Sequence, residues 1–257
     1  MLKVTPLFSG SKGNCTLIQS KNTNILLDAG FGYKNIVQAL KKNGVYPSDV
    51  DAIVITHEHS DHVSALAVWA KHYTTPIFVP SAIVNCIVSK SCSTNVHGVC
   101  DSFDIGDVSV DIYQCSHDSQ DCFGYRFGCL GDYVASVTDT GCWSDETIDF
   151  LSPCKTIMLE SNHDVGMLRR GDYPYPLKQR ILSNYGHLSN GQTSCILERL
   201  IGSKVKNVLL AHLSEENNTK ELVFSTAVTT YSKYNLTEGK DVNVYVVDQY
   251  ENEVSFE

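Results

Sequence analysis

The 257-residue sequence lacks several features that would assign it to a common class of protein. No apolar run approaches the roughly 18–20 residues that cross a bilayer, so we expect no membrane association. The opening segment, M-L-K-V-T-P-L-F-S-G, has neither the apolar core nor the cleavage site of a signal peptide, and a cytoplasmic location is therefore expected. Repeats, low-complexity tracts and linkers are also missing, which predicts a single domain over residues 1–257.

The sequence has 10 cysteines but no C-x-x-C pair, which excludes the usual zinc-ribbon and thioredoxin patterns. A chain of this length with 42% hydrophobic residues needs no disulfide framework, so most thiols are expected to be reduced and buried. Excess positive charge is lacking as well, since the net charge is −9. Sequence-independent binding along duplex DNA requires an extended basic surface. Any nucleic-acid substrate of this protein would therefore have to be held by local contacts.

Short apolar segments bounded by polar residues predict strands, and longer amphipathic segments predict helices. The predicted strands are Lys3–Phe8, Cys15–Gln19, Asn24–Asp28, Asp51–Ile55, Ile77–Val79, Val108–Tyr113, Phe123–Phe127, Tyr133–Val137, Thr156–Leu159, Val208–Leu210 and Val242–Val247. The predicted helices are Tyr33–Lys42, Ala65–Lys71, Ala82–Val88, Asp145–Leu151, Leu177–Asn184, Gln192–Ile201 and Lys220–Tyr231. Strands followed by interleaved helices and strands in both halves indicate an α/β fold with two packed sheets and helices outside.

The segment T-H-E-H-S-D-H, residues 56–62, carries the strongest chemical signal. It follows a predicted strand directly, and a loop at a strand's end allows polar side chains to converge at the rim of a sheet. Three imidazoles and one carboxylate suit divalent metals of hard to borderline character. The segment therefore predicts a metal site that uses His57, His59, Asp61 and His62.

Further ligand-type side chains follow other predicted strands. His117, Asp139 and His212 each come after an apolar strand, in the same position as the first cluster. Taken singly, each also fits an exposed or hydrogen-bonded histidine, or an aspartate that caps a turn. Three such residues at corresponding strand ends favour a shared site. His72, His97 and His163 have no such position, and we interpret them as structural or surface residues.

The order of these motifs, H-x-H-x-D-H, a later His, T-D-T-G and a final His after a strand, resembles the metallo-β-lactamase superfamily. The segments S-G-S-K-G-N-C-T, L-L-D-A-G-F, L-E-S-N-H-D, G-H-L-S-N and A-H-L-S-E-E-N-N resemble its YycJ/WalJ branch. The resemblance spans most of the chain. It implies the αββα four-layer sandwich of that superfamily.

The resemblance also implies a ligand set for two divalent metal ions. The first metal would take His57, His59 and His117, the second would take Asp61, His62 and His212, and Asp139 would bridge them. Such a pair of cations supplies a metal-bridging hydroxide as nucleophile. Asp61 would additionally orient or deprotonate the water. Imidazole and carboxylate ligands admit zinc, which we expect, as well as manganese or iron.

The motif G-H-L-S-N at residues 186–190 resembles the tRNase Z branch, where the corresponding histidine serves the leaving oxygen. By that similarity His187 would be a catalytic acid, and Glu160 would orient it. Such acid assistance typically contributes about 10²–10⁴-fold. Two alternatives stay open: His187 as a cap of the helix beginning near Asn190, and His187 as a further metal ligand.

Between Glu160 and His187 runs a basic and aromatic segment, which we interpret as a contact for phosphates and bases. The alternative is a solvated loop and helix face. The S-G-S-K-G-N loop would present two more polar side chains near the metals. The predicted substrate-binding residues are Lys12, Asn14, Arg169, Arg170, Lys178 and Arg180.

These features predict a metal-dependent hydrolase, a phosphodiesterase that acts on nucleic acid. The YycJ/WalJ resemblance implies a 5′-to-3′ DNA exonuclease. The alternatives are a phosphodiesterase on cyclic nucleotides or other small phosphodiesters, which the acidic charge suits equally well, and a tRNase Z-like RNA nuclease. A non-catalytic binding protein would require a damaged ligand set, and every ligand type is present. A homodimer is expected, since dimers are the commonest oligomers.

Overall fold

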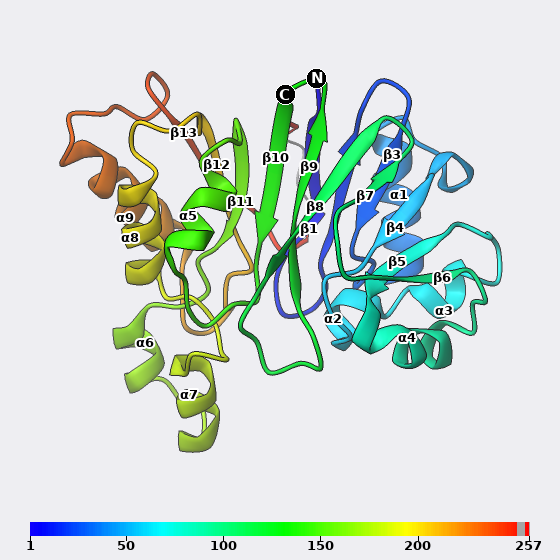
Figure 1. Ribbon diagram of the computed structural model, residues 1–257. Helices are drawn as coiled ribbons and strands as arrows, with labels where there is room; N and C mark the ends of the chain where they lie inside the picture. The colour runs from blue at the N-terminus through cyan, green and yellow to red at the C-terminus, as the bar shows by residue number, and fades with distance from the viewer. Residues whose placement is uncertain (251–254, 257) are drawn as a thin grey trace.

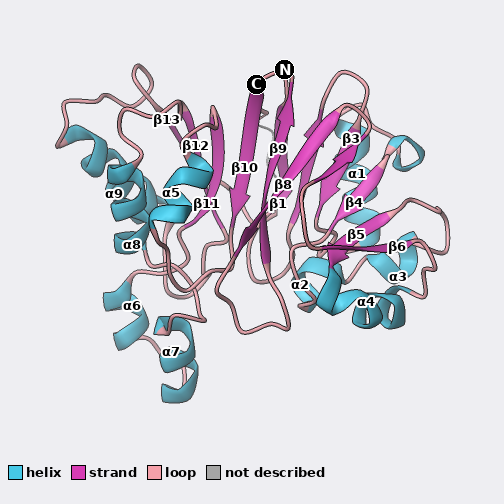
Figure 2. Cartoon of the chain, viewed as in Figure 1, coloured by secondary structure: helices cyan, strands magenta, loops and turns pink. Residues whose placement is uncertain are grey.

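The computed structural model describes residues 1–250, 255 and 256. Within them, strands form two sheets that face each other, with helices outside (Figures 1 and 2). The first sheet contains, in order, β1 (Lys3–Phe8), β2 (Cys15–Gln19), β3 (Asn24–Leu27), β4 (Ala52–Val54), β5 (Ile77–Pro80) and β6 (Val96–Val99). The second contains β13 (Asn243–Val246), β12 (Asn207–Ala211), β11 (Thr156–Glu160), β10 (Asp132–Val137), β9 (Phe123–Cys129), β8 (Val108–Gln114) and β7 (Phe103–Ile105).

The helices lie on the outer faces of the two sheets (Figure 1). Beside the first sheet are α1 (Tyr33–Lys42), α2 (Ser60–Val63), α3 (Leu66–Trp69) and α4 (Val84–Ser91), with short turns at Pro47–Asp49 and Ser81–Ile83. Beside the second are α5 (Asp145–Leu151), α8 (Asn190–Arg199) and α9 (Lys220–Ser232). Two more helices, α6 (Val165–Arg170) and α7 (Tyr175–Leu182), extend below the second sheet. This arrangement confirms the predicted αββα sandwich.

Alternation along the strands explains the layers. In β3, Leu27 faces the other sheet, whereas Leu26 belongs to the cluster beneath α1 and α3. In β12, Leu209 faces the first sheet, whereas Leu210 packs with the helices outside the second sheet. Successive side chains of a strand point to opposite faces, so a strand covered on both sides must be apolar throughout. For this reason the sequences of the central strands are unbroken runs of apolar residues.

Most element boundaries match the sequence-based prediction within two residues, and the helices at Tyr33–Lys42 and Asp145–Leu151 match it at both ends. The strands β6 and β7 and the helices α2 and α6 were not predicted. The two strands lie at sheet edges and contain polar residues, so they lack the apolar signature of central strands. Helix α7 begins earlier than predicted, at Tyr175, because Pro176 is tolerated in the first turn of a helix.

Among the described residues, every helix is too short or too polar to cross a membrane. All ten cysteines are free. Five of them are buried, namely Cys15, Cys115, Cys122, Cys129 and Cys154. The prediction that most thiols are buried was therefore wrong, because only half of the ten are.

Candidate metal centre

The T-H-E-H-S-D-H loop leaves the end of β4 and is held in place by neighbouring backbone. The amide of Ala29 donates to the carbonyl of His62 at 2.8 Å, and the amide of Asn14 donates to the carbonyl of Asp61 at 2.7 Å. A Cβ atom added at Gly30 would lie 1.6 Å from the carbonyl oxygen of Asp61. Glycine at position 30 is therefore required for the loop to pack this closely.

This contact leads to a first prediction. Gly30→Ala forces the Asp61 carbonyl to move, so we expect a loss of about 3 kcal/mol in the free energy of unfolding and weaker metal binding. Chemical denaturation and metal titration measure the two effects. Gly191→Ala is the matched control, because the nearest atom to its added Cβ is 4.0 Å away. Equal stability of the two variants would contradict the prediction.

The seven predicted ligands converge in space. The ligand atoms of His57, His59 and His117 lie within 4.8 Å of one another. The same holds within the group Asp61, His62 and His212, and within the group His57, His62 and Asp139. The strand-end residues, distant in sequence, thus meet the loop after β4 at one edge of the sandwich.

Unpaired buried atoms indicate that this cluster fits cations. Four inward-pointing atoms have no hydrogen-bond partner among the described residues: Nε2 of His57, His117 and His212, and Oδ2 of Asp139. Leaving a buried polar atom unsatisfied costs about 1–3 kcal/mol, so four in one cluster call for a ligand. Three imidazoles and a carboxylate are the donors that zinc and similar divalent metals take.

In two of these histidines, the hydrogen bond made by Nδ1 determines that Nε2 is the nitrogen available to a metal. Nδ1 of His117 lies 3.1 Å from the Gly186 carbonyl, which can only accept, so Nδ1 carries the proton and Nε2 keeps its lone pair. The carboxylate of Glu160 accepts from Nδ1 of His212 at 2.9 Å in the same way. Such outer partners set the tautomer of metal-binding histidines. Both rings are therefore oriented to bind metal through Nε2.

Burial and charge act on the titrating groups in opposite directions. Burial lowers the pKa of His57 and of His117, which keeps these rings in the neutral, metal-binding form. Burial also opposes charge on His62 and His212, but the nearby Asp139 carboxylate, with Asp28 beside His62, raises the pKa of both rings. The carboxylates thus give the cluster an attraction for positive charge.

Two residues of the metal cluster and a third residue beside it have a left-handed backbone conformation. Asp28, Asp139 and His212 follow strands β3, β10 and β12, with φ angles of 61°, 56° and 55°. This conformation costs a non-glycine residue on the order of 1–3 kcal/mol, and such residues concentrate at functional sites. The strain therefore supports a functional role for this edge of the sandwich.

Asp28 is a site residue that the sequence analysis missed. Its Oδ2 lies 2.8 Å from Nδ1 of His62, and its Oδ1 accepts from the amide of Thr56 at 2.9 Å. A carboxylate at the end of β3 could have been found by the strand-end criterion used for Asp139, because β3 and β4 are parallel and end at the same edge.

The contact with His62 leads to a second prediction. Asp28→Asn removes the negative charge beside the ring, and loss of such an outer partner typically weakens metal binding 10–100-fold. We expect this loss without unfolding, measured by titration against a competing chelator and by thermal melting. Asp104→Asn changes an exposed carboxylate far from the cluster and should leave metal binding unchanged. Similar affinities for the two variants would refute the role of Asp28.

Glu160 connects the metal cluster to His187. Its side chain is fully buried, and its Oε1 accepts from Nδ1 of His187 at 2.8 Å and from Nδ1 of His212 at 2.9 Å. Its Oε2 accepts from the amides of Thr140 and Leu188, both at 3.1 Å. Although burial opposes ionisation, the histidine partners hold the pKa of Glu160 well below its usual range. Glu160 is therefore an ionised anchor for both rings.

The helix-cap alternative for His187 is wrong. Helix α8 is capped by Ser189, whose side chain accepts from the amide of Gln192. His187 instead lines the cavity beside the metal cluster. Since its Nδ1 proton is donated to Glu160, its Nε2 is left for a ligand in that cavity.

The cavity has a volume of about 230 Å³. Its lining includes five of the seven predicted ligands and His187, together with Tyr173, Leu177, Arg180 and Ile181. Of the six predicted substrate-binding residues, Arg180 alone lines it within the described part of the chain.

The other predicted substrate contacts are engaged elsewhere. Lys12 pairs with Glu215 at 2.8 Å, and Lys178 donates to the carbonyl of Gly171 at 2.6 Å. Asn14 supports the metal loop through the Asp61 carbonyl at 3.3 Å. Arg169 and Arg170 end helix α6 outside the cavity. Arg180 itself forms an ion pair with Asp118.

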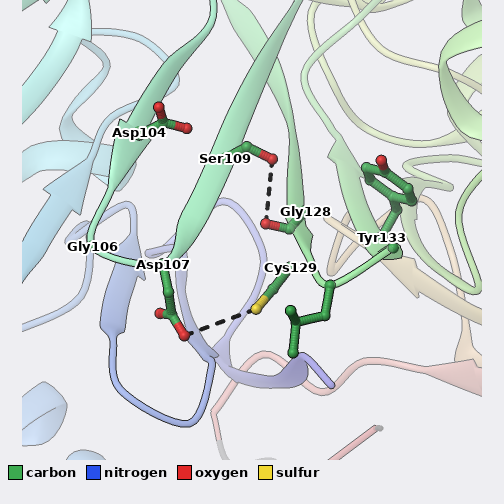
Figure 3. Close-up of a pocket in the computed structure, with 9 residues that line it drawn as sticks. Asp104, Gly106, Asp107, Ser109, Gly128, Cys129 and Tyr133 are labelled. Atoms are coloured by element: carbon green, nitrogen blue, oxygen red, sulfur yellow. Dashed lines mark hydrogen bonds between the residues drawn. The ribbon is translucent and has the colours of Figure 1, made fainter.

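A second cavity, of about 290 Å³, is lined by residues of the second sheet and its turns (Figure 3). It is bounded by the β7–β8 and β9–β10 turns, at the amino end of β10, whereas Asp139 follows the carboxyl end of that strand. Its lining includes Asp104 and Asp107 but no histidine. The cavity beside the histidine cluster is therefore the candidate active site.

Comparison with known proteins agrees with this assignment. Residues 9–85 match the model of the metallo-beta-lactamase superfamily. Exodeoxyribonuclease WalJ of Streptococcus pneumoniae serotype 2 is 36% identical over 252 residues, which cover 95% of this chain and 93% of that protein. Exodeoxyribonuclease YycJ of Bacillus anthracis is 35% identical over 226 residues, 86% of each protein.

Solved structures show the same fold. The metallo-beta-lactamase fold protein YhfI from Bacillus subtilis covers 100% of both chains with a TM-score of 0.76 and 18% identity. A diphosphatase from the PhnP family covers 100% of this chain and 98% of its own, with a TM-score of 0.70 and 16% identity. With the fold, the histidine cluster and close relatives over nearly the whole length in agreement, this chain belongs to the metallo-β-lactamase superfamily, in the family of the WalJ and YycJ proteins.

Proposed function

We propose that this protein is a metal-dependent phosphodiesterase that acts on DNA as a 5′-to-3′ exonuclease. The observation that carries the proposal is His187, held by a buried carboxylate beside a cluster of unpaired metal-type donors. A histidine in that position suits release of an alkoxide oxygen, as phosphodiester cleavage requires. The names of the WalJ and YycJ relatives supply the DNA substrate of the proposal.

The superfamily implies divalent metal ions, and the donor set fits them. The first would be held by His57, His59 and His117, the second by Asp61, His62 and His212, with Asp139 shared. Divalent metals, zinc in our proposal, would lower the pKa of water and neutralise charge on a phosphoryl oxygen when bound.

The protein's own side chains would perform the proton transfers. Asp61 lines the cavity, and it would orient the attacking water and accept its proton. His187 would donate a proton from Nε2 to the departing oxygen. Glu160 would hold the ring in that orientation and stabilise its positive charge, as a buried carboxylate does for a catalytic histidine.

Arg180 is the proposed contact for a substrate phosphate within the cavity, because its guanidinium could exchange Asp118 for that phosphate. The remaining predicted contacts would meet the DNA outside the cavity. We also propose a single domain, since one apolar cluster joins both sheets, and a cytoplasmic homodimer. The free thiols are consistent with a reducing compartment.

A second candidate function is hydrolysis of a small phosphodiester such as a cyclic nucleotide. The net charge of −9 and a cavity with one lining cation, already paired with Asp118, favour it. An RNA nuclease of the tRNase Z type remains the third candidate, because Glu160 and His187 would serve any phosphodiester.

A single assay separates the candidates. The metal-reconstituted protein is incubated with 5′-phosphorylated single- and double-stranded DNA, with RNA of the same sequence and with cyclic nucleotides. We expect progressive release of mononucleotides from the 5′ end of DNA. Cleavage confined to cyclic nucleotides or to RNA would replace the proposal by the corresponding alternative.

A further inference from the structure

The cavity beside the metal cluster is lined by two chemically different sets of side chains. One set consists of the metal-type ligands and His187. The other comes from α7 and the residue just before its cap, and it consists of the apolar Tyr173, Leu177 and Ile181 with the paired Arg180 on the same helix. Residues four apart lie on one face of a helix, so Leu177 and Ile181 point into the cavity together.

Tyr173 differs from the other tyrosines of this segment. Tyr175 is 74% exposed and Tyr185 is 64% exposed, and both lie outside the cavity. Tyr173 is half-buried and lines it. Within the part of the chain that the structure describes, Tyr173 stacks on no aromatic ring. Its ring is therefore available to a ligand inside the cavity.

The distribution of charge indicates what such a ligand looks like. Arg180 is the lining cation and is already paired with Asp118, and the other polar lining residues apart from the histidines and carboxylates are Ser11, Asn162 and Ser214. The anionic part of a ligand must then lie at the metal cluster, where Arg180 reaches it only by leaving Asp118. The part that contacts Tyr173, Leu177 and Ile181 must be uncharged and apolar. A nucleotide has this division, with a phosphate at one end and a flat base at the other.

The size of the cavity limits how much of a nucleic acid it accepts. Its 230 Å³ falls below the roughly 300–1,000 Å³ of ordinary small-molecule sites. A space of this size suits one nucleotide, with its phosphate at the metal cluster, rather than a base pair. Aromatic side chains bind unpaired bases by stacking, with little preference for sequence.

We propose that Tyr173 forms a stacking subsite for one unpaired nucleobase, that of the nucleotide whose phosphate lies at the metal cluster. Leu177 and Ile181 would support the sugar and the edge of the base. This inference rests on the proposed phosphodiesterase function and adds the residue that recognises the base.

The test measures binding rather than turnover. Thymidine 5′-monophosphate and 2-deoxyribose 5-phosphate, which differ by the base alone, are titrated calorimetrically into the metal-loaded protein. Base stacking on an aromatic side chain corresponds to a factor of about 5–150 in affinity. We expect the nucleotide to bind more tightly by that factor. Tyr173→Ala should abolish the difference without changing the affinity for the sugar phosphate, and Tyr173→Phe should preserve it.

Tyr175→Ala is the matched control, because it removes an exposed tyrosine two positions away and should leave both affinities unchanged. Melting temperatures show whether each variant is folded. The subsite is refuted if Tyr173→Ala leaves the base-dependent difference intact, or weakens both ligands equally. If the difference depends on Tyr173 but the protein cleaves no phosphodiester, the proposed function fails and the subsite stands.

Discussion

Asp139→Ala is expected to remove most bound metal and to lower activity by about 10³-fold or more. Asp139 has an Oδ2 without a hydrogen-bond partner, 3.4 Å from Nε2 of His62, and its Oδ1 lies 3.3 Å from Nδ1 of His212. A ligand atom of Asp139 also lies within 4.8 Å of one on His57. Asp139 is therefore close to ligands of both proposed metals, and its loss should affect both. Metal ions in such sites contribute several kcal/mol to transition-state stabilisation, which corresponds to this factor.

The measurement combines metal analysis of the purified variant with the nucleotide-release assay. Asp139→Asn keeps the shape of the side chain and should lose activity as well, because the amide carries no charge. Asp104→Ala removes an exposed carboxylate in the distant cavity and should retain both metal and activity. Full metal content in Asp139→Ala with near-normal turnover would exclude a ligand role for this residue.

His187→Ala is expected to retain metal while turnover of DNA falls about 10²–10⁴-fold, the usual contribution of a general acid. The loss should be much smaller for the p-nitrophenyl ester of thymidine 5′-monophosphate, since p-nitrophenolate leaves without needing a proton. Rates on the two substrates, together with metal analysis, separate acid catalysis from a structural effect. A matched surface control is His72→Ala, which should change neither rate.

Glu160→Gln should behave differently from His187→Ala. Its Oε1 accepts from both His187 and His212, so its loss should reduce metal affinity and turnover together. If His187→Ala also lost its metal, His187 would be a ligand rather than an acid, and the proposed proton transfer would be wrong.

The fold was largely predictable from local sequence. Strands such as β12 are buried on both faces and read as unbroken apolar runs, and α1 has strong amphipathic periodicity ending at Asn43-Gly44. Edge strands β6 and β7 were not predicted, because their burial depends on neighbouring strands that the local sequence does not specify. Helix α6 was missed for a related reason: it is one short basic segment with a single buried side chain, Leu168.

The chemical character of the site was also contained in the sequence. The strands that precede His117, Asp139 and His212, namely β8, β10 and β12, run in the same direction, so their carboxyl ends lie at one edge of the sandwich. The strand-end criterion could therefore group these residues with the T-H-E-H-S-D-H loop before any coordinates. The same reasoning would have included Asp28, had it been applied to β3. The function of each ligand remains a prediction for metal analysis.

Tertiary structure alone decided which charges are free to meet a substrate. Lys12 lies 203 positions from its partner Glu215, and Arg180 lies 62 positions from Asp118. No local pattern reveals such pairs, because a lysine or arginine has the same propensities whether or not a distant loop brings a carboxylate beside it. The apolar lining around Tyr173 likewise exists only because the tertiary structure brings residues of α7 and of the metal cluster to one cavity. Sequence determined which side chains carry the chemistry, and the packing of distant loops decided which of them face the cavity.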